Sequence, residues 1–333
     1  MGFLPDDVVR EASAANNADL LLTSGSEAAV VEVKLGHLMS NSQQEKYEAL
    51  GEGTELYLAA LEADEARIGL DSERWAFLRL GDLFAAWTSS EDALARSLAS
   101  DAASVLQDWD TVISGTLSAS KGQAGTPVEV VDQKFLARVL SRRIATDLRE
   151  RGRMAYAGVT SGGGVPLVAA WVPIRGESDD RCFIAEIRWR EMPGGELRFG
   201  VDFDPRPGQT EDEEVRRAAY ELSYSMDESI HHSAVHAALV ETRPDLAGAL
   251  RREKASRPVA RGDWEQVILH GLKGAPLESG ARNNRRRTTP AFYGDGALRF
   301  QAISDIDFSA ASAVDLVDLI DLTLEHLADN EPE

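Results

Sequence analysis

Two carboxylates and an amine near the start of the chain have the residue types and spacing needed for metal-assisted chemistry. Asp19 begins one short apolar run, and Glu32 and Lys34 lie on the next, with twelve residues between the two carboxylates. Carboxylate oxygens and a backbone carbonyl, here that of Val33, are the hard ligands that Mg²⁺ prefers. Such a metal can polarise a phosphodiester and help to generate hydroxide, while Lys34 offsets charge in the transition state.

A β-hairpin is the element that must bring these side chains together. Residues 19–23 and 28–34 are apolar runs typical of strands, and Ser-Gly-Ser-Glu at residues 24–27 favours a turn between them. Side chains on a strand alternate between its faces, so Glu32 and Lys34 point the same way. Pairing of the two strands then places the first carboxylate near both.

A polar helix is expected directly after the hairpin, over residues 41–50. Gln43 and Tyr47 are four residues apart on it, so they share one helix face. That face can turn toward the metal site or toward a nucleic-acid backbone.

These residues resemble a known family in their order and spacing. Asp19, Glu32 and Lys34 resemble the Asp…(Asp/Glu)-x-Lys signature of the PD-(D/E)XK nuclease superfamily, and Gln43 with Tyr47 is similar to the QxxxY motif of its RecB-like members. The resemblance covers about the first quarter of the chain. It implies an α/β fold with a restriction-endonuclease-like mixed β-sheet core flanked by helices, and Mg²⁺ or Mn²⁺ as the cofactor. It further implies catalytic roles for Asp19, Glu32 and Lys34, metal binding by Asp19, Glu32 and the Val33 carbonyl, and accessory roles for Gln43 and Tyr47.

An ordinary structural role explains the same residues without any chemistry. Asp19 can start or cap a strand, and Glu32 with Lys34 can form a solvated pair that contributes little stability. Gln43 and Tyr47 can belong to a half-exposed helix face. The joint pattern favours the nuclease interpretation, and the sequence alone leaves both open.

The amino-acid composition limits the classes of protein to which this chain can belong. The chain has 333 residues, of which 43% are hydrophobic, enough for one elaborated domain or two. No apolar run is long enough to span a bilayer, and the first residues do not form a secretory signal. The single cysteine, Cys182, excludes an internal disulfide framework and a cysteine-rich zinc site. A soluble cytoplasmic protein without a membrane partner is the simplest prediction.

The net charge of −21 argues against nonspecific affinity for nucleic acid. The distribution of charge matters more than its sum, and bound metal ions change the local sign. One basic cluster, Arg138 with Arg142 and Arg143, lies on the outer face of a helix expected over residues 128–151. A loop rich in Asn and Arg can contact nucleic acid or an acidic partner, or it can simply be solvated. Its candidate contacts are Arg282, Arg285, Arg286 and Arg287.

A Ser-, Lys- and Gly-containing stretch at residues 117–126 suggests a boundary in the chain. Residues 1–117 are expected to form the nuclease-like core with a helical extension, and residues 127–333 an α+β domain for substrate binding or regulation. Pro5 and the pair Asn16-Asn17 are start and stop signals that predict a short helix over residues 5–16. Further helices are predicted over residues 91–109, 210–230 and 305–327, and the first of these is expected to place Leu94, Leu98, Leu106 and Trp109 in the core. Strands are predicted over residues 54–61, 74–80 and 297–303, and four more are predicted from residue 154 on. Residues 263–272 are expected to form a strand or a short helix.

The resemblance predicts a metal-dependent nuclease that hydrolyses phosphodiester bonds of nucleic acid, DNA rather than RNA, in DNA repair or in defence against foreign DNA. One alternative is a nuclease-fold binding protein that no longer cleaves. Another is an acidic interaction subunit, with its acidic residues gathered on one exposed face and a protein as its partner. His232 and His236, four residues apart, could share a metal, but no third ligand is evident in the sequence.

Overall fold

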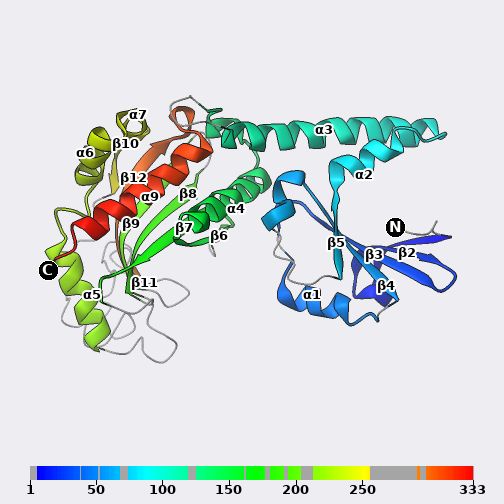
Figure 1. The fold of residues 1–333 in the computed structure, drawn as a ribbon, viewed down its shortest axis with the longest axis horizontal. Helices are drawn as coiled ribbons and strands as arrows, with labels where there is room; N and C mark the ends of the chain where they lie inside the picture. Colours follow the sequence, from blue (N-terminus) through cyan, green and yellow to red (C-terminus); the bar gives the residue numbers. More distant parts are fainter. Residues whose placement is uncertain are drawn as a thin grey trace, which may run out of the picture. The chain divides into compact units, whose positions relative to one another are not determined.

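The protein has a mixed α/β fold with two β-sheets (Figure 1). A computed structural model describes residues 6–37, 39–51, 53–67, 74–118, 125–160, 163–176, 181–190, 194–203, 213–255, 291–292 and 298–332. The chain divides into two compact units. The first contains Met1–Gly115 and Gln133–Arg143, and the second contains Thr116–Asp132 and Ile144–Glu333.

The first unit is built on a five-stranded mixed sheet with the strands in chain order. The first three strands are antiparallel, and the last three run parallel to one another. Parallel neighbours need a crossover, which helix α1 (Asn41–Glu48) provides between the third and fourth strands. The strands are β1 (Asp7–Ala12), β2 (Ala18–Ser24), β3 (Glu27–Lys34), β4 (Thr54–Ala60) and β5 (Trp75–Arg79).

Helix α1 covers the face of the sheet toward which Val30 and Glu32 of β3 point. Tyr47 of α1 packs in one apolar cluster with Val30 of β3 and with Leu56 and Leu58 of β4. Because side chains alternate along a strand, Glu32 lies on the same face as Val30, underneath the helix. The predicted hairpin, the helix after it and the strands at residues 54–61 and 74–80 are confirmed by this arrangement.

The helix predicted over residues 5–16 is wrong, because this segment forms β1 and a short 3₁₀ turn, Ser13–Ala15. β1 pairs along its length with β2, which satisfies one side of its backbone. The two asparagines expected to end a helix, Asn16 and Asn17, instead adopt positive φ angles of 57° and 62° and turn the chain into β2.

The rest of the first unit is helical. The helix predicted over residues 91–109 is confirmed, and Leu106 is buried in the core as predicted. Leu94 and Leu98 are 69% and 60% exposed, so the core prediction is wrong for these two residues. Phe135 packs edge-on against Trp109 with ring centroids 4.8 Å apart, so the first part of α4 clusters with this unit. The elements are the 3₁₀ helix η2 (Glu62–Arg67), α2 (Leu80–Trp87), α3 (Ala93–Leu117) and the start of α4 (Lys134–Glu150).

The second unit contains an antiparallel sheet with the order β10-β12-β9-β8-β7-β6, and β11 also pairs with β12. The four strands predicted from residue 154 are confirmed. β12 continues beyond residue 303, so the closing helix starts at Ala313 rather than 305, where Ser312 and Asp315 form a capping box. The strands are β6 (Met154–Val159), β7 (Pro166–Pro173), β8 (Arg181–Trp189), β9 (Gly194–Phe203), β10 (Leu250–Ala255), β11 (Ala291–Phe292) and β12 (Leu298–Asp307).

Helices pack against this second sheet and form its apolar core. α9 contacts β7, β8 and β9, while α5 contacts β9 and β12. The ring of Tyr220 on α5 lies 6.5 Å from that of Phe300 on β12. The prediction for residues 263–272 falls outside the described residues. The helices are α4 from Ile144 on, α5 (Glu213–Ser225), α6 (His232–Thr242), α7 (Pro244–Ala247) and α9 (Ala313–Asp329).

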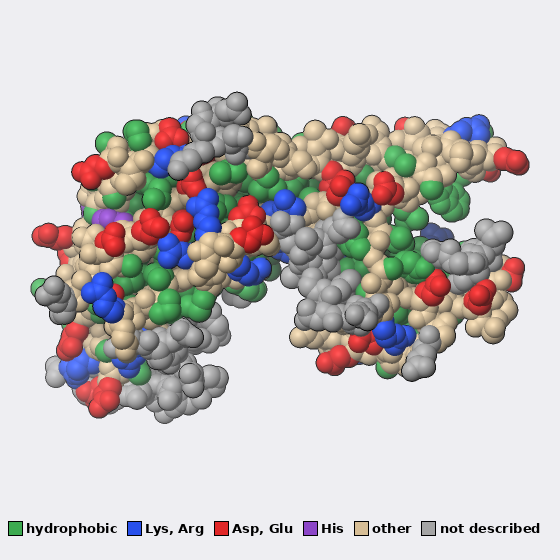
Figure 2. All heavy atoms as spheres, in the orientation of Figure 1, with side chains coloured by type: hydrophobic (Ala, Val, Ile, Leu, Met, Phe, Trp, Pro, Cys, Tyr) green, Lys and Arg blue, Asp and Glu red, His purple; other side chains and the backbone are tan. Residues whose placement is uncertain are grey.

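Acidic and basic side chains are interspersed on the face of the second unit that Figure 2 shows. The regularly spaced aspartates of α9 belong to ion pairs rather than to a simply solvated acidic face. Asp318 pairs with Arg151 and Arg243, and Asp321 pairs with Arg151 and Arg153. These pairs balance part of the negative charge of α9.

The loop after β3 depends on a glycine that alanine cannot replace. Gly36 has a φ of +71°, and a Cβ there would lie 2.7 Å from the Phe135 Cβ and 2.8 Å from its carbonyl oxygen. We expect Gly36→Ala to lower the free energy of unfolding of the first unit by more than about 2 kcal/mol, because strain and overlap add. Denaturant titration followed by circular dichroism measures this change.

Gly25→Ala is the matched control for this substitution. Gly25 has a φ of +59°, but no atom lies within 4 Å of the position that an alanine Cβ would take. Only the left-handed backbone conformation then disfavours alanine, and we expect it to lower the free energy of unfolding by about 1 kcal/mol. Equal losses in the two variants would show that the contact with Phe135 does not constrain the loop.

Candidate active site

The buried carboxylate of Glu32 is the centre of the site. Glu32 is 4% exposed and lies near the end of β3. Its Oε1 accepts a hydrogen bond from the Lys34 Nζ at 2.5 Å, and its Oε2 accepts one from the Tyr47 hydroxyl at 2.8 Å. Three of the predicted site residues therefore lie in direct contact.

Asp19 joins this group from the neighbouring strand. The pairing of β2 with β3 ends at Leu20 and Val31, so the next residues along are Asp19 and Glu32. The Asp19 Oδ2 accepts a hydrogen bond from the Val33 backbone N–H at 2.7 Å. This bond holds the first carboxylate at the end of the hairpin, close to the second.

Tyr47 is held as a hydrogen-bond donor. Burial raises the pKa of its hydroxyl well above the ordinary value, and the hydrogen bond to Glu32 and the charges of Glu32 and Asp19 raise that pKa further. The phenol therefore keeps its proton at neutral pH and can orient Glu32. Its ring packs edge-on against Trp75, with centroids 5.9 Å apart.

Helix α1 is fixed at its start by a capping box. The Ser40 hydroxyl accepts from the Gln43 backbone N–H at 3.2 Å, and the Gln43 side-chain oxygen accepts from the Ser40 backbone N–H at 3.4 Å. The structure thus brings Tyr47 to the carboxylates, whereas the Gln43 side chain lies at the helix cap. Gln43 acts here by orienting the helix that carries Tyr47.

Two residues that the sequence analysis did not connect lie beside this site. The Arg138 Nη1 of α4 is 2.7 Å from the His37 Nε2, in the loop that follows β3. Burial lowers the pKa of His37, and the charges of Arg138, Lys34 and Arg142 lower it further. The basic cluster on α4 was visible in the sequence, but no local pattern could pair it with a loop 101 residues away.

Arg142 is not on an outer helix face as predicted, because it forms a buried ion pair. Its guanidinium donates to the two oxygens of Asp64 at 2.9 and 2.6 Å, and Asp64 is 1% exposed. Arg142 also donates to the carbonyl of Gly36 at 3.2 Å. This bidentate pair ties α4 to the loop after β3.

The donor chemistry of the site fits a small hard cation. Asp19, Glu32 and the Val33 carbonyl carry the oxygen atoms that would hold such a cation, and Lys34 balances one of the two negative charges. Each carboxylate oxygen that already accepts a hydrogen bond retains further acceptor capacity. No group of three or more His, Cys, Asp or Glu side chains gathers in a metal-binding arrangement in the described part of the chain. Mg²⁺ commonly binds one or two carboxylates and keeps several waters.

Two further predicted features are the arginine-rich loop and the histidine pair. Arg282, Arg285, Arg286 and Arg287 lie outside the described residues. The rings of His232 and His236 are 5.9 Å apart, and the His232 Nδ1 is 2.9 Å from the Ser304 hydroxyl, which gives that imidazole a partner other than metal.

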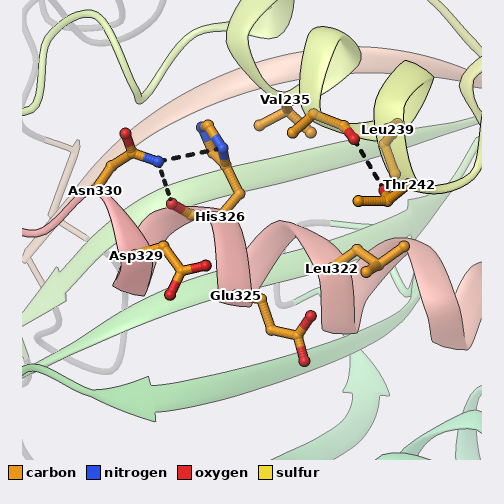
Figure 3. A pocket seen from close by; sticks show the side chains of 9 residues that line it. Val235, Leu239, Thr242, Leu322, Glu325, His326, Asp329 and Asn330 are labelled. Carbon is orange, nitrogen blue, oxygen red and sulfur yellow. Dashed lines mark hydrogen bonds between the residues drawn. The ribbon is translucent and has the colours of Figure 1, made fainter.

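A small groove between α6 and α9 lies in the second unit, and it contains none of the predicted site residues (Figure 3). Its volume is about 140 Å³. The Asn330 Nδ2 donates to the His326 carbonyl at 2.8 Å and is 3.4 Å from the His326 Nδ1. Figure 3 marks both contacts with dashed lines. The groove has apolar walls and an acidic rim, formed by Val235, Ala238, Leu239, Thr242, Leu322, Glu325, His326, Asp329 and Asn330.

Comparisons with known proteins found no matching family model, no similar curated protein and no similar solved structure. No helix among the described residues is both long and apolar enough to cross a membrane. Function must therefore be inferred from the side chains of the site.

Because Lys34 and Glu32 are in direct contact, we expect substitutions at the two positions to have strongly non-additive effects on stability. Lys34→Met leaves a buried carboxylate without its cation, which we expect to lower the free energy of unfolding by about 3 kcal/mol. Adding Glu32→Gln removes the uncompensated charge, so the double variant should recover at least about 1 kcal/mol of that loss. A double-mutant cycle from denaturant titrations measures the coupling.

Lys46→Met serves as the control, because Lys46 is an exposed lysine on α1. Its effect should stay within about 0.5 kcal/mol and should be additive with Glu32→Gln. Additive effects for Lys34→Met and Glu32→Gln would contradict a direct interaction between the two side chains.

Proposed function

We propose that the protein is a metal-dependent nuclease that hydrolyses phosphodiester bonds, with DNA as the preferred substrate. The observation that carries this proposal is the convergence of Asp19, Glu32 and Lys34 at the ends of two adjacent strands. Two carboxylates and an amine within one buried corner suit the binding of a divalent cation and the stabilisation of phosphate charge.

The order of elements around the site supports a restriction-endonuclease-like core. An antiparallel hairpin, β2–β3, leads into α1, and the chain then returns as β4 parallel to β3. The resemblance predicts the order helix–strand–turn–strand–helix–strand, and the chain follows this order from the first strand of the hairpin on. The segment before the hairpin departs from that expectation, since it is an edge strand where a helix was predicted.

Each side chain has a chemical role in this proposal. Asp19, Glu32 and the Val33 carbonyl would hold the metal, which when bound would polarise the phosphate and lower the pKa of a bound water. Tyr47 keeps the Glu32 carboxylate oriented through its hydroxyl. Lys34 places an ammonium group beside Glu32, where it can bind a phosphate oxygen as negative charge builds up on it.

A second candidate is a binding protein on the same core that does not cleave. The observation that favours it is that both oxygens of Glu32 are already hydrogen-bonded, one to Lys34 and one to Tyr47. If these bonds do not yield to a cation, Glu32 is a structural residue. This candidate predicts no stabilisation by Mg²⁺ or Mn²⁺.

A cleavage assay separates the two candidates. Linear, circular and single-stranded DNA, and RNA, are incubated with Mg²⁺ or Mn²⁺ and the wild-type, Glu32→Gln or Lys34→Ala protein. We expect metal-dependent cleavage of DNA, reduced at least about 100-fold in each variant because each removes a group that stabilises the transition state. Glu45→Gln and Lys46→Gln, exposed positions on α1, are matched controls and should cleave like the wild type.

Thermal melting of the same proteins provides an independent readout. A cation that binds only the folded protein raises the melting temperature, and Glu32→Gln should abolish this shift. Cleavage that survives both site substitutions would contradict the assignment. Absence of both cleavage and a metal-induced shift would favour the binding protein. A setting in DNA repair or in defence against foreign DNA follows from the resemblance alone and is part of the proposal.

A further inference from the structure

A cationic side chain from α4 lies beside the loop that follows the Glu32 strand. The Arg138 Nη1 is 2.7 Å from the His37 Nε2. An arginine always donates, so the His37 Nε2 must be the unprotonated acceptor of this bond. The lowered pKa of His37 agrees with a neutral ring at neutral pH. The contact with His37 therefore brings no negative charge to Arg138.

Arg138 differs from its neighbour Arg142 in what it binds. Arg142 is neutralised by the bidentate contact with Asp64. In the described part of the chain no carboxylate pairs with Arg138, and no acceptor lies within hydrogen-bond distance of its Nε, which is buried. The N–H groups of the guanidinium that do not contact His37 can donate to a further acceptor. Their planar arrangement matches the oxygens of a phosphate.

The position of Arg138 relative to Lys34 is held by several contacts. Gly36 packs against the backbone of Phe135, and Arg142 donates to the Gly36 carbonyl. Lys34 is the last residue of β3 and His37 follows it by three residues, so the short loop that contains Gly36 keeps His37 close to the end of this strand. Lys34 and Arg138 thus both flank this loop, in one corner of the first unit.

The charge around this corner contrasts with that of the whole chain. Lys34, Arg138 and Arg142 balance Asp19, Glu32 and Asp64, so these six side chains are together neutral in a protein of net charge −21. One bound divalent cation would make the group positive. A phosphate backbone would then meet attraction here.

We propose that Arg138, held in place by its contact with His37, binds a phosphate of the nucleic-acid backbone next to the phosphate that is cleaved. This inference rests on the proposed nuclease function and extends it to a positioning residue on a helix outside the hairpin. Arg138 increases the affinity for the nucleic acid and positions its backbone along the site. Lys34 acts at the reacting phosphate.

Binding measurements in a non-cleaving background test the role of Arg138. Glu32→Gln protein, alone and combined with Arg138→Gln or Arg138→Lys, is titrated against a fluorescent DNA duplex with Mg²⁺ at several salt concentrations. We expect Arg138→Gln to weaken binding roughly tenfold and to reduce the slope of log K against log salt by about 1, as loss of one phosphate contact does. Arg138→Lys keeps the charge and should retain the slope.

Arg149→Gln is the matched control on the same helix. Arg149 is exposed and donates to the Ala155 carbonyl, within the second unit. Its substitution should leave both affinity and salt slope unchanged. Because Gln keeps much of the stem and a donor for His37, Arg138→Gln should melt like its parent protein.

Cleavage kinetics in the wild-type background separate the ways in which the two proposals can fail. Arg138→Gln is expected to raise KM with a smaller effect on kcat, since the residue does not touch the reacting phosphate. An unchanged KM and salt slope, with active wild-type protein, would overturn the role of Arg138 and leave the nuclease function standing. If the wild-type protein neither cleaves nor binds nucleic acid, both proposals fall.

Discussion

The placement of the buried Glu32 carboxylate is the constraint on which the site depends. A charge in the apolar face beneath α1 must be paired and hydrogen-bonded, since an uncompensated buried carboxylate is strongly destabilising. Lys34 and Tyr47 meet that requirement, and Tyr47 reaches Glu32 only because the Ser40–Gln43 capping box and the packing on Trp75 fix the helix. In the proposed metal site, the same contacts that permit burial would also hold the carboxylate in place for a cation.

A second constraint comes from outside the hairpin, through the first part of α4. The Arg142–Asp64 pair and the contact of Gly36 with Phe135 fix the loop after β3. This loop leads directly from the site to α1, so its position decides where both Lys34 and Tyr47 lie. The arrangement also balances acidic side chains with basic ones in this part of a chain whose net charge is −21.

The candidate catalytic residues were predictable because they are close in sequence. Asp19, Glu32, Lys34 and Tyr47 come from one hairpin and the helix after it, where strand alternation and helical spacing decide which side chains meet. His37 and Arg138 are 101 residues apart, and Asp64 and Arg142 are 78 apart, so only tertiary packing joins them. The edge strand β1 was missed for a similar reason. Its backbone is satisfied by β2, whereas its own sequence carries helix-like start and stop signals. Leu94 and Leu98 have helical periodicity, but periodicity does not reveal which helix face finds a partner.

Anomalous diffraction from crystals of the wild-type protein grown with Mn²⁺ tests the proposed metal site most directly. We predict a peak at about 2.1 Å from oxygens of Asp19 and Glu32, with the Val33 carbonyl as a further ligand. At least one hydrogen bond to Glu32 should then be rearranged. Crystals with saturating Mn²⁺, no peak at this position and both hydrogen bonds intact would contradict the metal site. Glu32 and Lys34 would in that case be a structural pair.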